Sequence, residues 1–176
     1  MKKKVIFSWS GGKDSALALY ELVRSGEYDI AALLTTVTKD YDRISMHGVR
    51  TVLLEKQAKA LGITLEKALM KKGATIEENE SKIREVMQRY FGNGVLLNAA
   101  GDIALEDVKK YKDDNLARIG MEGVYPLWKR GSAELARRFI VLGFKSVITC
   151  VDTALLDKSF VGREFEGVGQ FFGRWF

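Results

Sequence analysis

Residues 10–15, SGGKDS, bring together the kinds of groups that bind a phosphate chain. The adjacent glycines let the backbone turn tightly and approach a ligand closely, and Lys13 adds a positive charge. The hydroxyls of Ser10 and Ser15 can donate hydrogen bonds to oxyanions. Apolar residues at helical spacing follow over residues 16–23, so the segment also precedes a helix N-terminus, where unpaired N–H groups attract anions. We therefore expect a polyphosphate ligand at this segment.

The segment fits neither of two common nucleotide motifs. In G-x-x-x-x-G-K-[ST], Phe7 would replace the first glycine and Asp14 the final hydroxyl residue. The pattern G-x-G-x-x-G fails because Lys13 follows the adjacent glycines. The segment instead resembles the S-G-G-x-D-S pyrophosphate loop of the N-type ATP pyrophosphatases, which cleave ATP to AMP and pyrophosphate. The alternative interpretation is a serine–glycine turn that simply begins a helix.

Strand and helix patterns alternate along the whole chain. The sequence predicts strands over 4–9, 29–37, 63–69, 94–99, 123–127 and 145–151, and helices over 16–23, 49–61, 75–90, 105–119 and 132–142. Residues 39–45 are polar and read as a hairpin or flap. This alternation predicts an α/β fold, with a doubly wound, mostly parallel sheet and helices on both faces. Ligands then bind beyond the carboxyl ends of the strands, where the SGGKDS segment lies.

Other segments are predicted to reach the same edge of the sheet. Thr35 and Thr36 end the second strand, where they can meet a nucleotide base or serve only the strand. Residues 45–48 contain His47, the only histidine and so the one side chain expected to titrate near neutral pH. His47 serves either in the functional site or as a capping or packing residue. Asp102 precedes the 105–119 helix, so it can cap that helix, hold a magnesium ion or orient a nucleophile.

Residues 120–128 contain the only proline, Pro126, which forces Tyr125 into an extended conformation. Glu122 and Trp128 beside this rigid turn are candidates to line a pocket, and a buried corner of the core is the alternative.

Composition limits the class of protein. A length of 176 residues suits one domain, and no apolar run reaches membrane-spanning length. One cysteine, Cys150, excludes an intramolecular disulfide and favours a reducing, cytoplasmic location. The formal charge of +5 favours anionic ligands but is too small to indicate nucleic-acid binding.

A set of motifs in a fixed order resembles the diphthine–ammonia ligase family. These are SGGKDS, His47 before a helix ending in ALGI, GDIALED at 101–107, YPLW at 125–128 and LGFKSVITCVD at 142–152, followed by Val161, Gly162 and Arg163. The resemblance implies a Rossmann-like domain over 1–176, in which 101–176 forms a smaller substrate-side portion. It also implies ATP and Mg²⁺ as cofactors, free ammonia as a substrate, and diphthine on elongation factor 2 as the carboxylate that is adenylated and amidated.

The motifs and the resemblance together assign candidate site residues. The catalytic candidates are Lys13, Asp14 and Asp102, and the substrate-side candidates are Glu122, Trp128 and Arg163. The metal-binding positions stay unassigned. The nucleotide-binding candidates are Ser10, Gly11, Gly12, Lys13, Asp14, Ser15, Thr35, Thr36, Met46, His47 and Gly101.

Three alternatives stay open. Residues 164–167 resemble an acidic segment that helps to form the substrate side in the family, but here they directly follow the Gly162–Arg163 step. The first alternative is therefore an acceptor carboxylate other than that of diphthine. RNA thiolation is a second, although Cys150 stands alone in a predicted apolar strand, where we expect it to be inert. A non-catalytic ATP-binding module is the third. The aromatic residues of segment 171–176 predict either an oligomer contact or packing onto the core.

Overall fold

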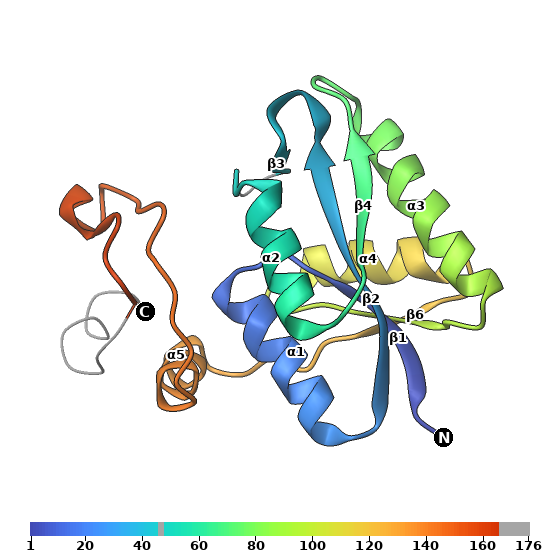
Figure 1. Cartoon of the computed structure of the whole chain (residues 1–176), viewed down its shortest axis with the longest axis horizontal. Helices are drawn as coiled ribbons and strands as arrows, with labels where there is room; N and C mark the ends of the chain where they lie inside the picture. The colour runs from blue at the N-terminus through green and yellow to red at the C-terminus, as the bar shows by residue number, and fades with distance from the viewer. Residues whose placement is uncertain (46–47, 166–176) are drawn as a thin grey trace.

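The computed structural model describes residues 1–45 and 48–165, and it confirms the predicted α/β class. In the described residues the sheet has six strands, of which five run parallel in the order β4–β2–β1–β5–β6 (Figure 1). The sixth, β3, pairs antiparallel with the end of β2, where a hairpin or flap was predicted. The strands are β1 (Lys3–Ser8), β2 (Tyr28–Thr38), β3 (Arg43–Ile44), β4 (Leu65–Met70), β5 (Leu97–Ala99) and β6 (Glu122–Val124).

Helices cover both faces of the sheet, as the doubly wound class requires (Figure 1). One face packs against α1 (Lys13–Ser25), α2 (Thr51–Leu61) and α5 (Ser132–Val141), and the other against α3 (Ile76–Gly92) and α4 (Glu106–Ala117). Single 3₁₀ turns lie at Lys39–Tyr41 and Lys158–Phe160. None of the helices in the described ranges combines the length and the apolar character that a membrane span requires.

The central strands β1 and β2 carry buried apolar side chains on both sides, because both faces of the sheet are covered there. In β1, Val5 and Phe7 point to the cluster that holds α1, α2 and α5, while Ile6 points to the cluster under α3 and α4. In β2, Leu33 and Leu34 divide between the two clusters in the same way. A near-continuous apolar run therefore produces a central strand with two cores.

Local sequence signals begin and end several of the helices. Gly26 and Gly62 follow α1 and α2 with φ of 70° and 67°, a left-handed conformation that a side chain would strain. A capping box begins α3: the Glu78 backbone N donates to Thr75 Oγ1 at 3.2 Å, and the Thr75 backbone N donates to Glu78 Oε2 at 2.8 Å.

The predicted strand over 145–151 is wrong. In the described residues this segment makes only one isolated bridge, between Val147 and Glu164, and Val147 is 53% exposed. Apolar β-branched residues form a regular strand only where a partner strand lies along them, and here the neighbour is the short segment 162–165, joined for example by the hydrogen bond from Ile148 N to the Arg163 carbonyl at 2.9 Å. Cys150 is consequently exposed, which corrects the expectation that it lies in an apolar strand.

The order of the strands creates a crevice beside β1. The chain passes from β1 to β2 and β4 on one side, then returns to β5 and β6 on the other, so the direction of winding reverses between β1 and β5. Connections leave a crevice at the carboxyl ends of strands at such a switch point. The segments after β1 and β5 both lead into it.

Candidate functional site

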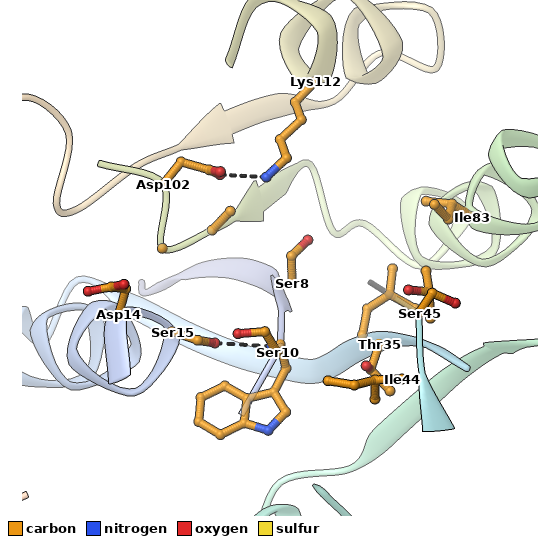
Figure 2. Close-up of a pocket in the computed structure, with 15 residues that line it drawn as sticks. Ser8, Ser10, Asp14, Ser15, Thr35, Ile44, Ser45, Ile83, Asp102 and Lys112 are labelled. Atoms are coloured by element: carbon orange, nitrogen blue, oxygen red, sulfur yellow. Dashed lines mark hydrogen bonds and ion pairs between the residues drawn. The ribbon is translucent and has the colours of Figure 1, made fainter. Parts of the chain in front are cut away.

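A cavity of about 370 Å³ opens at the carboxyl edge of the sheet, at this switch point (Figure 2). Strand ends, the SGGKDS segment, the segment after β5, α3 and α4 all contribute to its wall. The lining residues are Ser8, Trp9, Ser10, Asp14, Ser15, Leu34, Thr35, Thr36, Ile44, Ser45, Ile83, Ala100, Gly101, Asp102 and Lys112.

Gln57 of α2, which does not line the cavity, holds the SGGKDS segment by a hydrogen bond. Gln57 Nε2 donates to the Gly11 carbonyl at 3.2 Å, and Trp9 Nε1 donates to Gln57 Oε1 at 3.2 Å. Gly11 has φ of 73°, and a Cβ built there would lie 2.7 Å from Gln57 Oε1. Glycine is therefore favoured at this position by the left-handed backbone conformation, whereas Gln57 Oε1, at the end of a flexible side chain, can move aside. Sequence analysis missed Gln57, since nothing in the α2 sequence distinguishes it from an exposed polar residue.

Hydroxyls shape the segment from inside. The Ser10 backbone N donates to Ser15 Oγ, and the Gly12 backbone N donates to Ser10 Oγ, each at 3.3 Å. Gly12 is the N-cap residue of α1, and no side chain caps this helix. The N–H groups of the first turn of α1 therefore remain available to a ligand. Lys13 Nζ lies 2.6 Å from Asp14 Oδ1. The first turn therefore offers donors and a cation, and its one carboxylate is already paired.

Gly101 allows the segment after β5 to lie directly against this turn. A Cβ at Gly101 would lie 2.9 Å from the backbone C and O of Asp14 and 3.0 Å from the backbone N of Ser15. These are main-chain atoms of a helix, which cannot move aside cheaply. Glycine at 101 thus sets the spacing between the two walls of the cavity.

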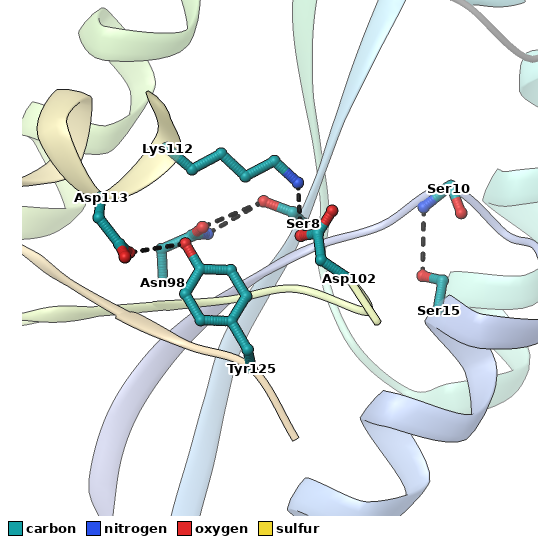
Figure 3. Close-up of polar contacts among 8 residues, drawn as sticks. All are labelled: Ser8, Ser10, Ser15, Asn98, Asp102, Lys112, Asp113 and Tyr125. Carbon is teal, nitrogen blue, oxygen red and sulfur yellow. Dashed lines mark hydrogen bonds and ion pairs between the residues drawn. The ribbon is translucent and has the colours of Figure 1, made fainter. Parts of the chain in front are cut away.

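Asp102 does not cap the following helix, which corrects one of its three predicted roles. The N-cap position of α4 is Leu105. Asp102 Oδ2 instead accepts from Lys112 Nζ at 2.6 Å inside the cavity (Figures 2 and 3). Sequence analysis missed Lys112, because it is one of several lysines in α4 and only the packing of that helix selects it.

A buried amide ties β1 to β5 below the cavity (Figure 3). Asn98 Nδ2 donates to the Ile6 carbonyl at 3.1 Å and lies 3.1 Å from Ser8 Oγ, and Ser8 Oγ lies 3.2 Å from Asn98 Oδ1. Because Ser8 lines the cavity and Asn98 does not, Asn98 acts as a support for the cavity floor. This residue too was absent from the sequence predictions.

Tyr125 and Trp128 belong to a neighbouring cluster outside the cavity lining. Tyr125 donates to Asp113 Oδ1 at 2.8 Å, and Lys109 Nζ lies 4.7 Å and 5.7 Å from the ring centroids of Tyr125 and Trp128. Burial, then the Asp113 carboxylate, raises the pKa of Tyr125. Burial alone would raise the pKa of Asp113, but hydrogen bonds from Lys109 and Tyr125 lower it overall.

The other predicted residues divide between the cavity and distant surfaces. Thr35 is buried and Thr36 accepts a backbone hydrogen bond from Ser45, all three at the cavity wall. Glu122 begins β6, at the opposite end of that strand from the cavity edge. Arg163 is exposed and donates through Nε to the Ser159 carbonyl at 3.0 Å, away from the lining. Met46 and His47 lie outside the described residues.

The cavity carboxylates fit a magnesium ion only as partners of a phosphate ligand. In the described ranges no group of three or more His, Cys, Asp and Glu side chains gathers as a metal site. Asp14 and Asp102 both line the cavity. Mg²⁺ in nucleotide sites typically uses one or two carboxylates together with phosphate oxygens and water, so this donor set suits Mg²⁺ that arrives with ATP.

Comparisons with known proteins agree with the fold and show the family. Residues 2–123 match the family described as "Diphthamide synthase N-terminal domain". No curated protein matches. A solved structure described as a predicted subunit of tRNA methyltransferase from Methanocaldococcus jannaschii has a TM-score of 0.51 at 17% identity, over 85% of this chain and 80% of that one.

A second solved structure, the U34-tRNA thiolase NcsA from Methanococcus maripaludis with its [4Fe-4S] cluster, has a TM-score of 0.45 at 17% identity. The match covers 81% of this chain and 57% of that one. At this identity the first neighbour supports the fold, and the second carries no further argument. The family match spans the sheet up to the start of β6 and includes every residue that lines the cavity.

Proposed function

Because the chain belongs to the diphthamide synthase N-terminal domain family, we propose that it cleaves ATP to AMP and pyrophosphate and uses the AMP to activate a carboxylate for amide formation with ammonia. The observation that carries this proposal is the SGGKDS segment at the N-terminus of α1, beside a cavity at the switch point of the sheet. Thr35 and Thr36, which also line the cavity, would contact the nucleotide base.

In the proposed reaction, an acceptor carboxylate oxygen attacks the α-phosphorus of ATP. The bond from the α-phosphorus to the bridging oxygen breaks, and pyrophosphate leaves with that electron pair. Ammonia then attacks the acyl carbon, AMP leaves, and the nitrogen loses a proton to give the amide. Adenylation is needed because a free carboxylate is a poor electrophile.

The chain's own groups suit the first step. The leaving pyrophosphate gains negative charge, which the N–H groups of the first α1 turn and the Lys13 ammonium would stabilise. Asp14 and Asp102 would hold a magnesium ion, which supplies further positive charge at the phosphates. No covalent protein nucleophile is needed, which fits a cavity whose described lining contains no cysteine.

The family match is the basis on which we propose the acceptor of the AMP group. Diphthine on elongation factor 2 is the carboxylate that this family match supports best. The main competitor is a base carbonyl of tRNA, which the same adenylation would activate for thiolation.

The test incubates the protein with ATP, Mg²⁺ and ammonia, and with either diphthine-bearing elongation factor 2 or unmodified tRNA. We expect AMP and pyrophosphate only with the elongation factor, and mass spectrometry should show a carboxamide in place of the carboxylate. AMP formation with tRNA alone would replace the proposed acceptor. No AMP with either acceptor would leave a nucleotide-binding module.

A further inference from the structure

Two carboxylates line the cavity, Asp14 on one wall and Asp102 on the other (Figure 2), and each is paired with a lysine. On one wall Lys13 Nζ lies 2.6 Å from Asp14 Oδ1, and on the other Lys112 Nζ lies 2.6 Å from Asp102 Oδ2. Among the described residues that line the cavity, Lys112 is the only basic one, against two carboxylates. Each carboxylate of the lining is therefore paired with an ammonium group, but Lys13, the partner of Asp14, lies outside the lining.

Such a site cannot receive a polyphosphate without rearrangement. The lining carries a net negative charge, and an added anion would be repelled unless ammonium groups turn toward it and the carboxylates are neutralised. A divalent cation at Asp102 would neutralise that carboxylate and remove the partner of Lys112. The freed ammonium would then lie at the cavity wall, opposite the SGGKDS segment.

We propose that Lys112 is a phosphate-binding residue of this site, held by Asp102 until a divalent cation takes the carboxylate. This inference rests on the proposed use of ATP. It makes nucleotide and metal binding cooperative, because each ligand takes one member of the pair and thereby frees the other. The exposed fractions, 36% for Lys112 and 20% for Asp102, leave both side chains room to move.

The same helix offers a matched control. Lys110 Nζ lies 2.6 Å from Asp114 Oδ2, the same kind of pair at the same distance, but Lys110 is 75% exposed and does not line the cavity. Substitution of Lys110 therefore removes one positive charge from α4 without touching the site.

The test is a double-mutant cycle of ATP affinity, measured by calorimetry with and without Mg²⁺, on the wild type, Lys112→Met, Asp102→Asn and the double variant. We expect Lys112→Met to weaken ATP binding about tenfold in Mg²⁺, an effect that Lys112→Arg largely avoids and Lys110→Met does not show. Without Mg²⁺, Asp102→Asn should strengthen ATP binding, because it frees Lys112.

The decisive outcome is non-additivity. The gain from Asp102→Asn without Mg²⁺ should be at least several-fold smaller when residue 112 is Met, since no ammonium is then released. An equal gain in both backgrounds, or Lys112→Met affinity equal to that of Lys110→Met, would overturn the inference while leaving ATP use intact. A wild-type protein that binds no ATP under either condition would instead contradict the proposed function, and the inference with it. Thermal unfolding of each variant checks that it is folded.

Discussion

At the scale of single residues, close approach of main chain decides the geometry of the site. Gly101 lies against the first turn of α1, where a Cβ would meet backbone atoms of Asp14 and Ser15. At Gly11 the left-handed backbone, with φ of 73°, favours glycine, because the nearest atom, Gln57 Oε1, belongs to a flexible side chain. The sequence shows glycines at these positions, but only the structure shows what each one is close to.

We predict that Gly101→Ala pushes the segment after β5 away from α1 and weakens ATP binding at least tenfold, with a loss of about 1–3 kcal/mol in the free energy of unfolding. Calorimetry and urea denaturation measure the two effects. The control is Gly92→Ala at the end of α3, where a Cβ meets nothing within 4 Å and stability should hold or rise. Unchanged ATP affinity in Gly101→Ala would show that this contact does not set the cavity.

A second residue-scale prediction concerns the buried amide beneath the cavity. Asn98→Ala leaves the Ile6 carbonyl and the Ser8 hydroxyl without their partner, so we expect a loss of about 1–3 kcal/mol in the free energy of unfolding. Asn93→Ala, an exposed position, should cost less than about 0.5 kcal/mol. Urea denaturation compares the two variants, and equal costs would argue against a supporting role for Asn98.

At the scale of elements, α3 packs on β4 through the apolar cluster and is also linked to it through one carboxylate, that of Glu66. Tyr90 donates to Glu66 Oε1 at 2.9 Å, and Arg89 Nη2 lies 2.5 Å from Glu66 Oε2. Burial, followed by the hydrogen bond to Glu66, raises the pKa of Tyr90 to about 12. Since α3 supplies Ile83 to the cavity wall, this contact links helix position to the site.

The raised pKa gives a pH-dependent prediction for Tyr90→Phe. A group whose pKa is raised on folding stabilises the protein fully below its unfolded pKa, near 10, and loses that contribution as the pH rises through about 12. We expect Tyr90→Phe to cost about 1 kcal/mol at neutral pH, with the gap to wild type narrowing between pH 10 and 12.

Denaturation at several pH values measures this gap, with Tyr41→Phe as an exposed control. A gap that stays constant up to pH 12 would contradict the assigned contact.

Sequence patterns predicted helices and strands well where the structure depends on residues that are close together in the sequence. The helices over 49–61 and 75–90 follow from local spacing of apolar residues, and their ends have local causes too, Gly62 after α2 and the Thr75–Glu78 capping box before α3. The strand over 145–151 failed because pairing depends on a neighbour, which no local pattern specifies. Lys112, Gln57 and Asn98 were missed for the same reason, since each acts on a residue 10 to 92 positions away.

At the scale of the whole molecule, the family match and the cavity coincide. Residues 2–123 contain all of the cavity lining, and they end within β6. The later described residues add α5, which packs against α1, and a segment that extends away from the sheet in Figure 1. The prediction that 101–176 forms a substrate-side portion stays a prediction, with α4 and β6 of that range built into the sheet and its cover.

The most direct test of the central claim is the identity of the products of ATP. Wild-type protein with ATP, Mg²⁺, ammonia and diphthine-bearing elongation factor 2 should yield AMP and pyrophosphate, separated by ion-exchange chromatography. Lys13→Ala and Asp14→Asn should lower that yield about 100-fold while the proteins stay folded, and Lys110→Met should not change it. Formation of ADP and phosphate instead, or equal AMP yields from all these proteins, would contradict the account.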